Sequence, residues 1–110
     1  MWLYTTDGFY SIVEDRFCKP GEVMVRGRNR EDIERFKQKN NLRKAIIETQ
    51  QADYHYRIPI SKKKLAKYLE EYALNLRYSN FKNTIPHQEH TRHTAYYRCW
   101  QAMYDYQNSQ

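Results

Sequence analysis

The chain has 110 residues, a length that fits one domain with a modest hydrophobic core and for which dimerisation would add stability. Lys and Arg number 19 against 13 Asp and Glu, and the net charge of +6 favours a polyanionic partner such as RNA, DNA, a nucleotide or membrane headgroups. Cys18 and Cys99 match no metal-binding or redox spacing. No apolar run has the length of a signal sequence or a membrane span, so we expect a cytoplasmic protein without a membrane partner.

The N-terminal quarter of the chain predicts a three-stranded meander, because short alternating segments are separated by turn residues. The expected strands and turns are 2–5, Asp7-Gly8, 9–14, Lys19-Pro20-Gly21 and 22–28. Asn29 then predicts the start of a helix that runs through about Lys39, with Ile33 and Phe36 turned inward. A fourth strand is expected over 44–49.

The segment from Asp53 to Ile60 alternates strictly, which predicts a fifth strand. One face would carry Tyr54, Tyr56, Ile58 and Ile60, and the other Asp53, His55 and Arg57.

Ser61 predicts the start of a helix that runs to about Arg77 and has an apolar stripe of Leu65, Leu69, Tyr72 and Leu76. Its first turn carries three lysines, 62–64, although the helix dipole already places positive charge there. This pattern predicts a nearby anion; the alternative is a solvated run of charges.

Residues 78–83 form a polar, aromatic connector, and a last helix is expected over 87–106. Its buried side would contain Tyr96, Cys99, Trp100 and Met103, and residues 107–110 would be a frayed tail. We therefore predict a single α+β domain over 1–106, with a mostly antiparallel sheet of about five strands and helices packed on one face.

Arg26 and Arg28 share one face of the expected third strand, and Arg57 lies on the polar face of the fifth. If these faces coincide, three guanidinium groups line one concavity, which suits phosphates. Alternatively the arginines lie over the rim of the sheet or pair with Glu48 and Asp53. The 11 tyrosines likewise leave two interpretations open, a tyrosine-rich core and a surface for base stacking.

His87, His90 and His93 recur at steps of three, which spread over an arc of a helix and do not converge on a metal ion. One of them could exchange a proton near neutral pH, or each could be an ordinary surface histidine. We find no glycine-rich phosphate loop and no carboxylate cluster, so we expect no metal and no cofactor. If the protein cleaves phosphodiesters, it must use amines, guanidiniums, hydroxyls and imidazole, which suits RNA because its own 2′-hydroxyl can attack.

Six segments spread over nearly the whole chain resemble a widespread family of small bacterial proteins. They are Trp2–Thr5, Gly8–Val13, Val25–Arg28, Ala52–Arg57, Tyr78–Lys82 and Arg92–Tyr96. The resemblance extends to CRISPR-associated ring nucleases, which linearise the cyclic oligoadenylate messengers of type III immunity. It implies a metal-independent nuclease acting on a cyclic oligoadenylate or another RNA-like ligand.

Carried over segment by segment, the resemblance implies catalytic roles for Lys82, His93 and Ser11. The residues that it implies for phosphate or nucleotide binding are Arg26, Arg28, Tyr54, Arg57 and Asn80. A symmetric messenger also favours a homodimer, and the aromatic side of the last helix offers apolar surface for one. The alternative function is a non-catalytic regulator that binds nucleic acid or protein.

Overall fold

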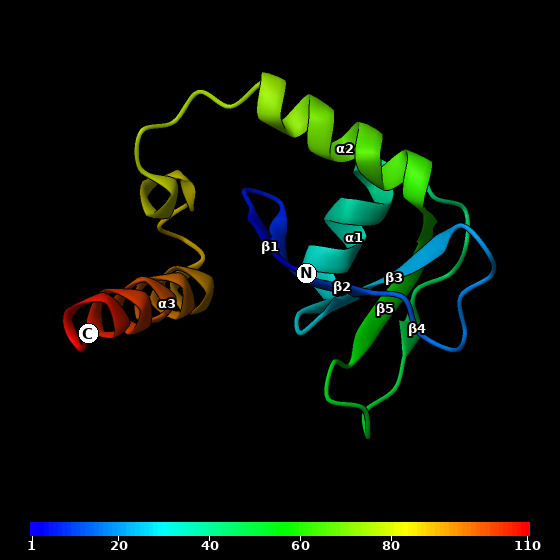
Figure 1. The fold of residues 1–110 in the computed structure, drawn as a ribbon, viewed down its shortest axis with the longest axis horizontal. Coiled ribbons are helices and arrows are strands. Elements are labelled where there is room, and N and C mark those ends of the chain that lie inside the picture. Colours follow the sequence, from blue (N-terminus) through cyan, green and yellow to red (C-terminus); the bar gives the residue numbers. More distant parts are fainter. The chain divides into compact units, whose positions relative to one another are not determined.

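A computed structural model describes all residues from Met1 to Gln110 (Figure 1). The chain forms two compact units, Met1–Leu76 and Arg77–Gln110, where the sequence predicts one domain over 1–106. Each unit is described by itself below. None of the helices combines the length and the apolar character needed to cross a membrane.

The first unit contains a five-stranded sheet in which every neighbouring pair of strands is antiparallel. Its strands are β1 (Trp2–Thr5), β2 (Gly8–Val13), β3 (Glu22–Gly27), β4 (Ile47–Glu48) and β5 (Tyr56–Ser61). They are arranged in the order β1-β2-β3-β5-β4, so β3 lies at the centre, between β2 and β5. The predicted α+β fold is confirmed.

Two helices pack on one face of this sheet, α1 (Arg30–Lys39) against β2, β3 and β5 and α2 (Lys62–Leu74) against β5. Each begins at a residue whose side chain caps it. The Asn29 Oδ1 atom accepts a hydrogen bond from the Glu31 backbone N–H at 2.9 Å, and the Ser61 Oγ atom accepts one from Lys64 at 3.1 Å. Both helix starts were predicted.

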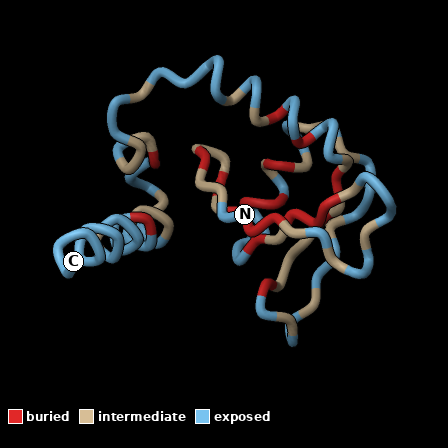
Figure 2. The backbone as a smooth tube through the Cα atoms, viewed as in Figure 1, coloured by how far each residue is buried: buried red, intermediate tan, exposed pale blue.

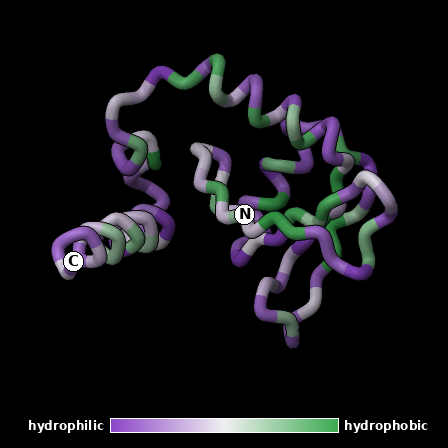
Figure 3. Tube along the Cα trace, in the orientation of Figure 1, coloured by the Kyte–Doolittle hydropathy of each residue, from purple (hydrophilic) through white to green (hydrophobic).

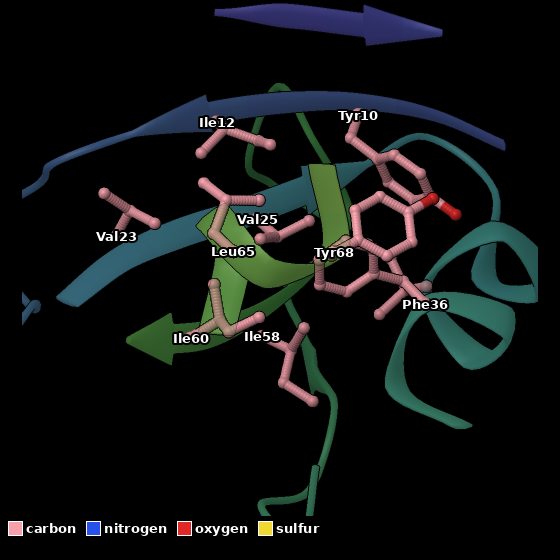
Figure 4. Close-up of a cluster of buried hydrophobic side chains, with 10 residues drawn as sticks. Tyr10, Ile12, Val23, Val25, Phe36, Ile58, Ile60, Leu65 and Tyr68 are labelled. Atoms are coloured by element: carbon pink, nitrogen blue, oxygen red, sulfur yellow. The ribbon is translucent and has the colours of Figure 1, made fainter. Parts of the chain in front are cut away.

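The core lies between the sheet and these two helices (Figure 4). Alternate residues of β2, β3 and β5 point into it, as the period of two in a strand requires. The Phe36 ring of α1 lies 5.0 Å from the Tyr10 ring and 5.0 Å from the Tyr68 ring, so the three aromatic rings join β2, α1 and α2. The buried cluster comprises Tyr10, Ile12, Val23, Val25, Ile33, Phe36, Ile58, Ile60, Leu65 and Tyr68.

A buried polar network fixes the β1–β2 turn to the helices. The Tyr68 hydroxyl donates to Asp7 Oδ2 at 2.7 Å and lies 2.9 Å from the Thr5 hydroxyl. Asp32 of α1 accepts from the Phe9 N–H at 3.2 Å and from the Arg35 guanidinium at 2.6 Å. A Cβ atom at Gly8 would lie 2.5 Å from Asp32 Cγ, so only glycine permits this close approach.

Several predicted boundaries in the first unit are wrong. β4 contains only Ile47–Glu48 instead of 44–49, and β5 begins at Tyr56 because residues 52–55 form a bend. α2 ends at Leu74, where Asn75 caps it, so Leu76 lies outside the helix and is exposed. The buried residues of α2 are Leu65, which was predicted, and Tyr68, which was not.

The second unit contains a short 3₁₀ helix, η1 (Phe81–Thr84), and a long helix, α3 (His90–Asn108). The Phe81 ring stacks on the Tyr96 ring with their centroids 5.7 Å apart. Tyr96 is the only buried residue of α3, and the blue tube in Figure 2 shows how much of this helix is exposed. The predicted buried side is therefore wrong for Cys99, Trp100 and Met103, and the tail expected from residue 107 begins later because α3 continues to Asn108.

Candidate functional site

The face of the sheet opposite to α1 and α2, called here the second face, carries a row of cross-strand partners. Directly opposed residues of antiparallel strands point to the same side of a sheet. From β1 to β4 the row comprises Trp2, Ser11, Arg26, Arg57 and Ile47. The chain thus brings together Ser11, Arg26 and Arg57, which the sequence proposed from distant segments.

Arg26 lies at the middle of this row. Its Nη2 atom donates to the buried Ser11 hydroxyl at 2.6 Å, and its Nε–H donates to the Ser11 carbonyl at 3.4 Å. A guanidinium has five N–H donors, so these two bonds leave three without a protein acceptor. Ser11 therefore holds the Arg26 side chain over β2, and the rest of the guanidinium can bind an anion.

Arg57 lies directly opposite Arg26 on β5, and its side chain forms neither a hydrogen bond nor an ion pair within the chain. Its Nε atom is buried without an acceptor. A buried unsatisfied donor on a charged group is costly, and like charges on directly opposed residues repel. An anion bound between the two arginines would remove both penalties. The predicted alternative, in which Arg57 pairs with Asp53 or Glu48, is not found: Glu48 pairs with Arg30 and Asp53 with Arg28.

The Tyr54 ring makes cation–π contacts with two of the arginines, Arg26 and Arg28. Its ring lies 4.6 Å from the Arg26 guanidinium and 4.0 Å from that of Arg28, and only 6% of Tyr54 is exposed. The bend at 52–55 places it with the arginines, so the expectation that it shares a face with Ile58 is wrong. Because two guanidiniums lie over its ring, Tyr54 orients cations and offers little surface to a base.

Arg28 is more strongly committed to the protein than the other two arginines. Its guanidinium donates to the Asp53 carbonyl at 3.0 Å and to Asp53 Oδ1 at 3.2 Å. Desolvation works to lower the pKa of Arg28, but the hydrogen bond that it donates to Asp53 and the contact with Tyr54 outweigh desolvation and raise the pKa. Here the predicted pairing with Asp53 is present. We name Arg26, Arg28 and Arg57 together the arginine cluster.

Three aromatic side chains flank the arginine cluster on the same face, and the sequence analysis did not single them out. Tyr4 stacks on Phe9 with ring centroids 4.5 Å apart, and Trp2 meets Phe9 edge to face at 6.1 Å. Trp2 is 73% exposed. The signal was present in the alternation of β1 and β2, since Phe9 and Ser11 are two residues apart and hence on one face.

The lysines at the start of α2 find only one partner within the first unit. Lys62 Nζ lies 3.0 Å from a Glu14 carboxylate oxygen. For this lysine, the anion that the sequence predicts is a carboxylate of the protein itself. Lys64 lines a hollow of about 310 Å³ with Ser61, Arg43 and Lys44. Lys44 in turn pairs with Glu22 at 3.2 Å, and this surface therefore combines free and neutralised cations.

In the second unit, Lys82 Nζ lies 3.3 Å from the Asn80 amide oxygen and 5.1 Å from the centre of the Trp100 ring. The His93 ring stacks on the His87 ring at 5.6 Å. No hydrogen bond or ring contact joins Lys82 to His93, but Trp100 and His93 are seven residues apart and so lie on one face of α3, about 10 Å apart along its axis. The structure thus joins Lys82 to Asn80 and His93 to His87, and no contact of these kinds joins the two pairs.

The chain shows no group of three or more His, Cys, Asp or Glu side chains that could hold a metal ion, and both cysteines are free thiols. Known proteins give no further guidance: no family model, no curated protein and no solved structure matches this chain.

Proposed function

We propose that the protein binds the phosphodiester backbone of an RNA-like ligand at the arginine cluster. The observation that carries the proposal is Arg57, a cation without any partner that stands opposite a second arginine with free donors. Such an arrangement is unfavourable in the free protein, and a phosphate would bind both guanidiniums at once. The net charge of +6 favours the same class of ligand.

Within this class, the resemblance of the six segments supports a cyclic oligoadenylate as the ligand and its linearisation, in the cytoplasm, as the reaction. The ligand's 2′-hydroxyl would attack the adjacent phosphorus, the bond from that phosphorus to the 5′-oxygen would break, and the departing 5′-oxygen would take up a proton; no metal ion is required. Lys82 would neutralise the charge that develops on the phosphate, and His93 would exchange the proton. Ser11 would position Arg26, to which it is hydrogen-bonded.

The experiment that tests this proposal is incubation of the purified protein with cyclic oligoadenylates of several ring sizes in EDTA, followed by chromatography. We expect a linear oligoadenylate that ends in a 2′,3′-cyclic phosphate. Binding without turnover would leave the alternative, a non-catalytic regulator. Loss of turnover in EDTA with recovery on addition of Mg²⁺ or Mn²⁺ would contradict the mechanism.

We propose in addition that two copies associate through α3, whose exposed side carries Tyr97, Trp100, Met103 and Tyr104. In Figure 3 this helix alternates between hydrophilic and weakly hydrophobic residues. The surface is self-complementary: in an antiparallel pair of α3 helices centred between Gln101 and Ala102, Arg98 of one copy would face Asp105 of the other, and Trp100 would face Met103. Exposed apolar surface of this kind is typical of an interface.

A further inference from the structure

The row of cross-strand partners on the second face does not end at the arginine cluster, because Trp2 is the partner of Ser11 on the edge strand β1. Arg26 reaches across to the Ser11 hydroxyl, and its guanidinium therefore lies over β2. Neighbouring strands are about 5 Å apart. The free donors of Arg26 and the indole of Trp2 thus lie on adjacent strands of one surface.

Neighbouring aromatic side chains hold the Trp2 ring in an exposed position. Its indole leans on the Phe9 ring at an interplanar angle of 85°, and Phe9 is held from the other side by Tyr4, which stacks on it at 4.5 Å. The backbone beneath is fixed as well, since the Met1 carbonyl accepts from the Ile12 N–H at 2.8 Å and the Met1 amino group donates to the Ile12 carbonyl at 2.8 Å. Trp2 nevertheless remains 73% exposed.

We propose that Trp2, supported by Phe9 and Tyr4, is a stacking platform for a nucleobase of a single-stranded RNA whose phosphates bind Arg26 and Arg57. This inference rests on the proposed function. A base has a flat π face that stacks on an exposed aromatic ring, and a positively charged groove beside such a ring is the usual arrangement for single-stranded nucleic acids. The strand would cross the sheet from β1 towards β5.

The test uses Trp2 as its own reporter. The chain has two tryptophans, so a Trp100→Phe background leaves Trp2 as the only one, and every variant is compared in that background. The probes are linear hexa-adenylate RNA and an abasic ribose-phosphate oligomer of the same length. We expect hexa-adenylate to quench the Trp2 fluorescence, and the abasic oligomer to bind more weakly without quenching.

The variants separate stacking from charge. Trp2→Ala should weaken hexa-adenylate binding by about 5- to 150-fold and leave the abasic oligomer unaffected, because stacking is the only interaction removed. Trp2→Phe should restore most of the affinity. Phe17→Ala is the matched control, since Phe17 is 63% exposed and also has an arginine, Arg16, 4.9 Å from its ring, but lies in the β2–β3 loop. It should bind like its parent.

Unchanged hexa-adenylate affinity in a folded Trp2→Ala protein would overturn the platform, as would equally tight binding of an acidic peptide that competes for the same site. If Arg57→Gln still weakens binding in that case, the proposed function survives without the platform. If neither RNA binds and Arg57→Gln has no effect, the proposed function itself has failed.

Discussion

Arg26 and Arg57 are directly opposed across β3 and β5, and neither is neutralised by a carboxylate. Directly opposed residues on one face have Cβ atoms about 5 Å apart, and like charges on such a pair are destabilising. A pairing that weakens the fold is typical of a binding site, where the ligand supplies the missing charge.

Replacing Arg57 should therefore stabilise the protein. We expect Arg57→Met to raise the free energy of unfolding by about 1 kcal/mol, because it removes the buried unsatisfied Nε–H and the repulsion while keeping most of the aliphatic stem. Urea unfolding measures the change. Arg43→Met is the control: Arg43 is exposed and has no ion pair, so its replacement should have little effect. A marked loss of stability in Arg57→Met would show that Arg57 has a structural role.

The same residue should be required for binding. Arg57→Gln should weaken the binding of oligoadenylates by about 1.5–3 kcal/mol, the range for a hydrogen bond to a charged group. The salt dependence of binding should also become shallower, because one phosphate contact fewer releases fewer counterions. Isothermal titration at several salt concentrations measures both quantities, and Arg43→Gln controls for the loss of net charge. Equal losses in the two variants would rule out a specific contact at Arg57.

Turnover should depend on Lys82 and His93. Each of Lys82→Ala and His93→Ala is expected to slow cleavage of a cyclic oligoadenylate by about 10²–10⁴-fold, the usual contribution of a general acid or base. Single-turnover rates in EDTA, with circular dichroism to verify folding, provide the measurement. His90→Ala is matched to His93→Ala because both residues lie in the first turn of α3, and it should retain full activity. An inactive His90→Ala protein would mean that the helix end, and not His93 alone, is what matters.

The α3 surface should determine the oligomeric state. We expect light scattering to give the mass of a dimer at micromolar concentration and Trp100→Glu to give a monomer, because a buried charge would replace an aromatic contact. Leu74→Glu offers a matched control, since Leu74 is 70% exposed at the end of α2. A wild-type monomer at micromolar concentration would exclude the interface.

Alkaline pH should unfold the protein through two buried tyrosines. Burial raises the pKa of Tyr10 and Tyr68 above the ordinary 10.0. The neighbouring Tyr68 raises the pKa of Tyr10 further, and the hydrogen bond to Asp7 raises that of Tyr68 further. The unfolded chain therefore loses these protons first, and stability is complete below about pH 10 and declines above it. Each tyrosine should contribute a decline of about 1.4 kcal/mol per pH unit.

Urea unfolding between about pH 9 and pH 11 follows this decline, which should be shallower in Tyr68→Phe and unchanged in Tyr106→Phe, where the replaced ring is exposed. A flat profile in the wild type would mean that both hydroxyls ionise without cost in the folded state.

The sequence predicted much of the first unit because its signals are local. Alternation identifies β2, β3 and most of β5, and the capping residues Asn29 and Ser61 identify the starts of α1 and α2. The register of the strands could not be predicted, because no local pattern in the sequence shows that Ser11, Arg26 and Arg57 are cross-strand partners. The position of Tyr54 could not be predicted either. The alternation in the sequence continues through residues 52–55, but these residues form a bend, which places Tyr54 on the second face.

The second unit was predicted less well for a different physical reason. Apolar residues at Cys99, Trp100 and Met103 follow helical spacing, and such a stripe normally indicates a buried face. In α3 these side chains are exposed, so the pattern describes a surface available for contact. An apolar stripe in the sequence does not show whether its side chains pack against the same chain or against another molecule.

The exposure of α3 also determines how quickly its backbone amides exchange with solvent. Only one of its 19 residues is buried, whereas most of the stability of a helix in a protein comes from tertiary packing of one of its faces. Its amide hydrogens should therefore exchange through local opening, long before those of β3 and β5, which open only when the first unit unfolds. Any molecule that covers the aromatic side of α3 would slow this exchange, and the formation of a complete helix would then be part of the binding free energy.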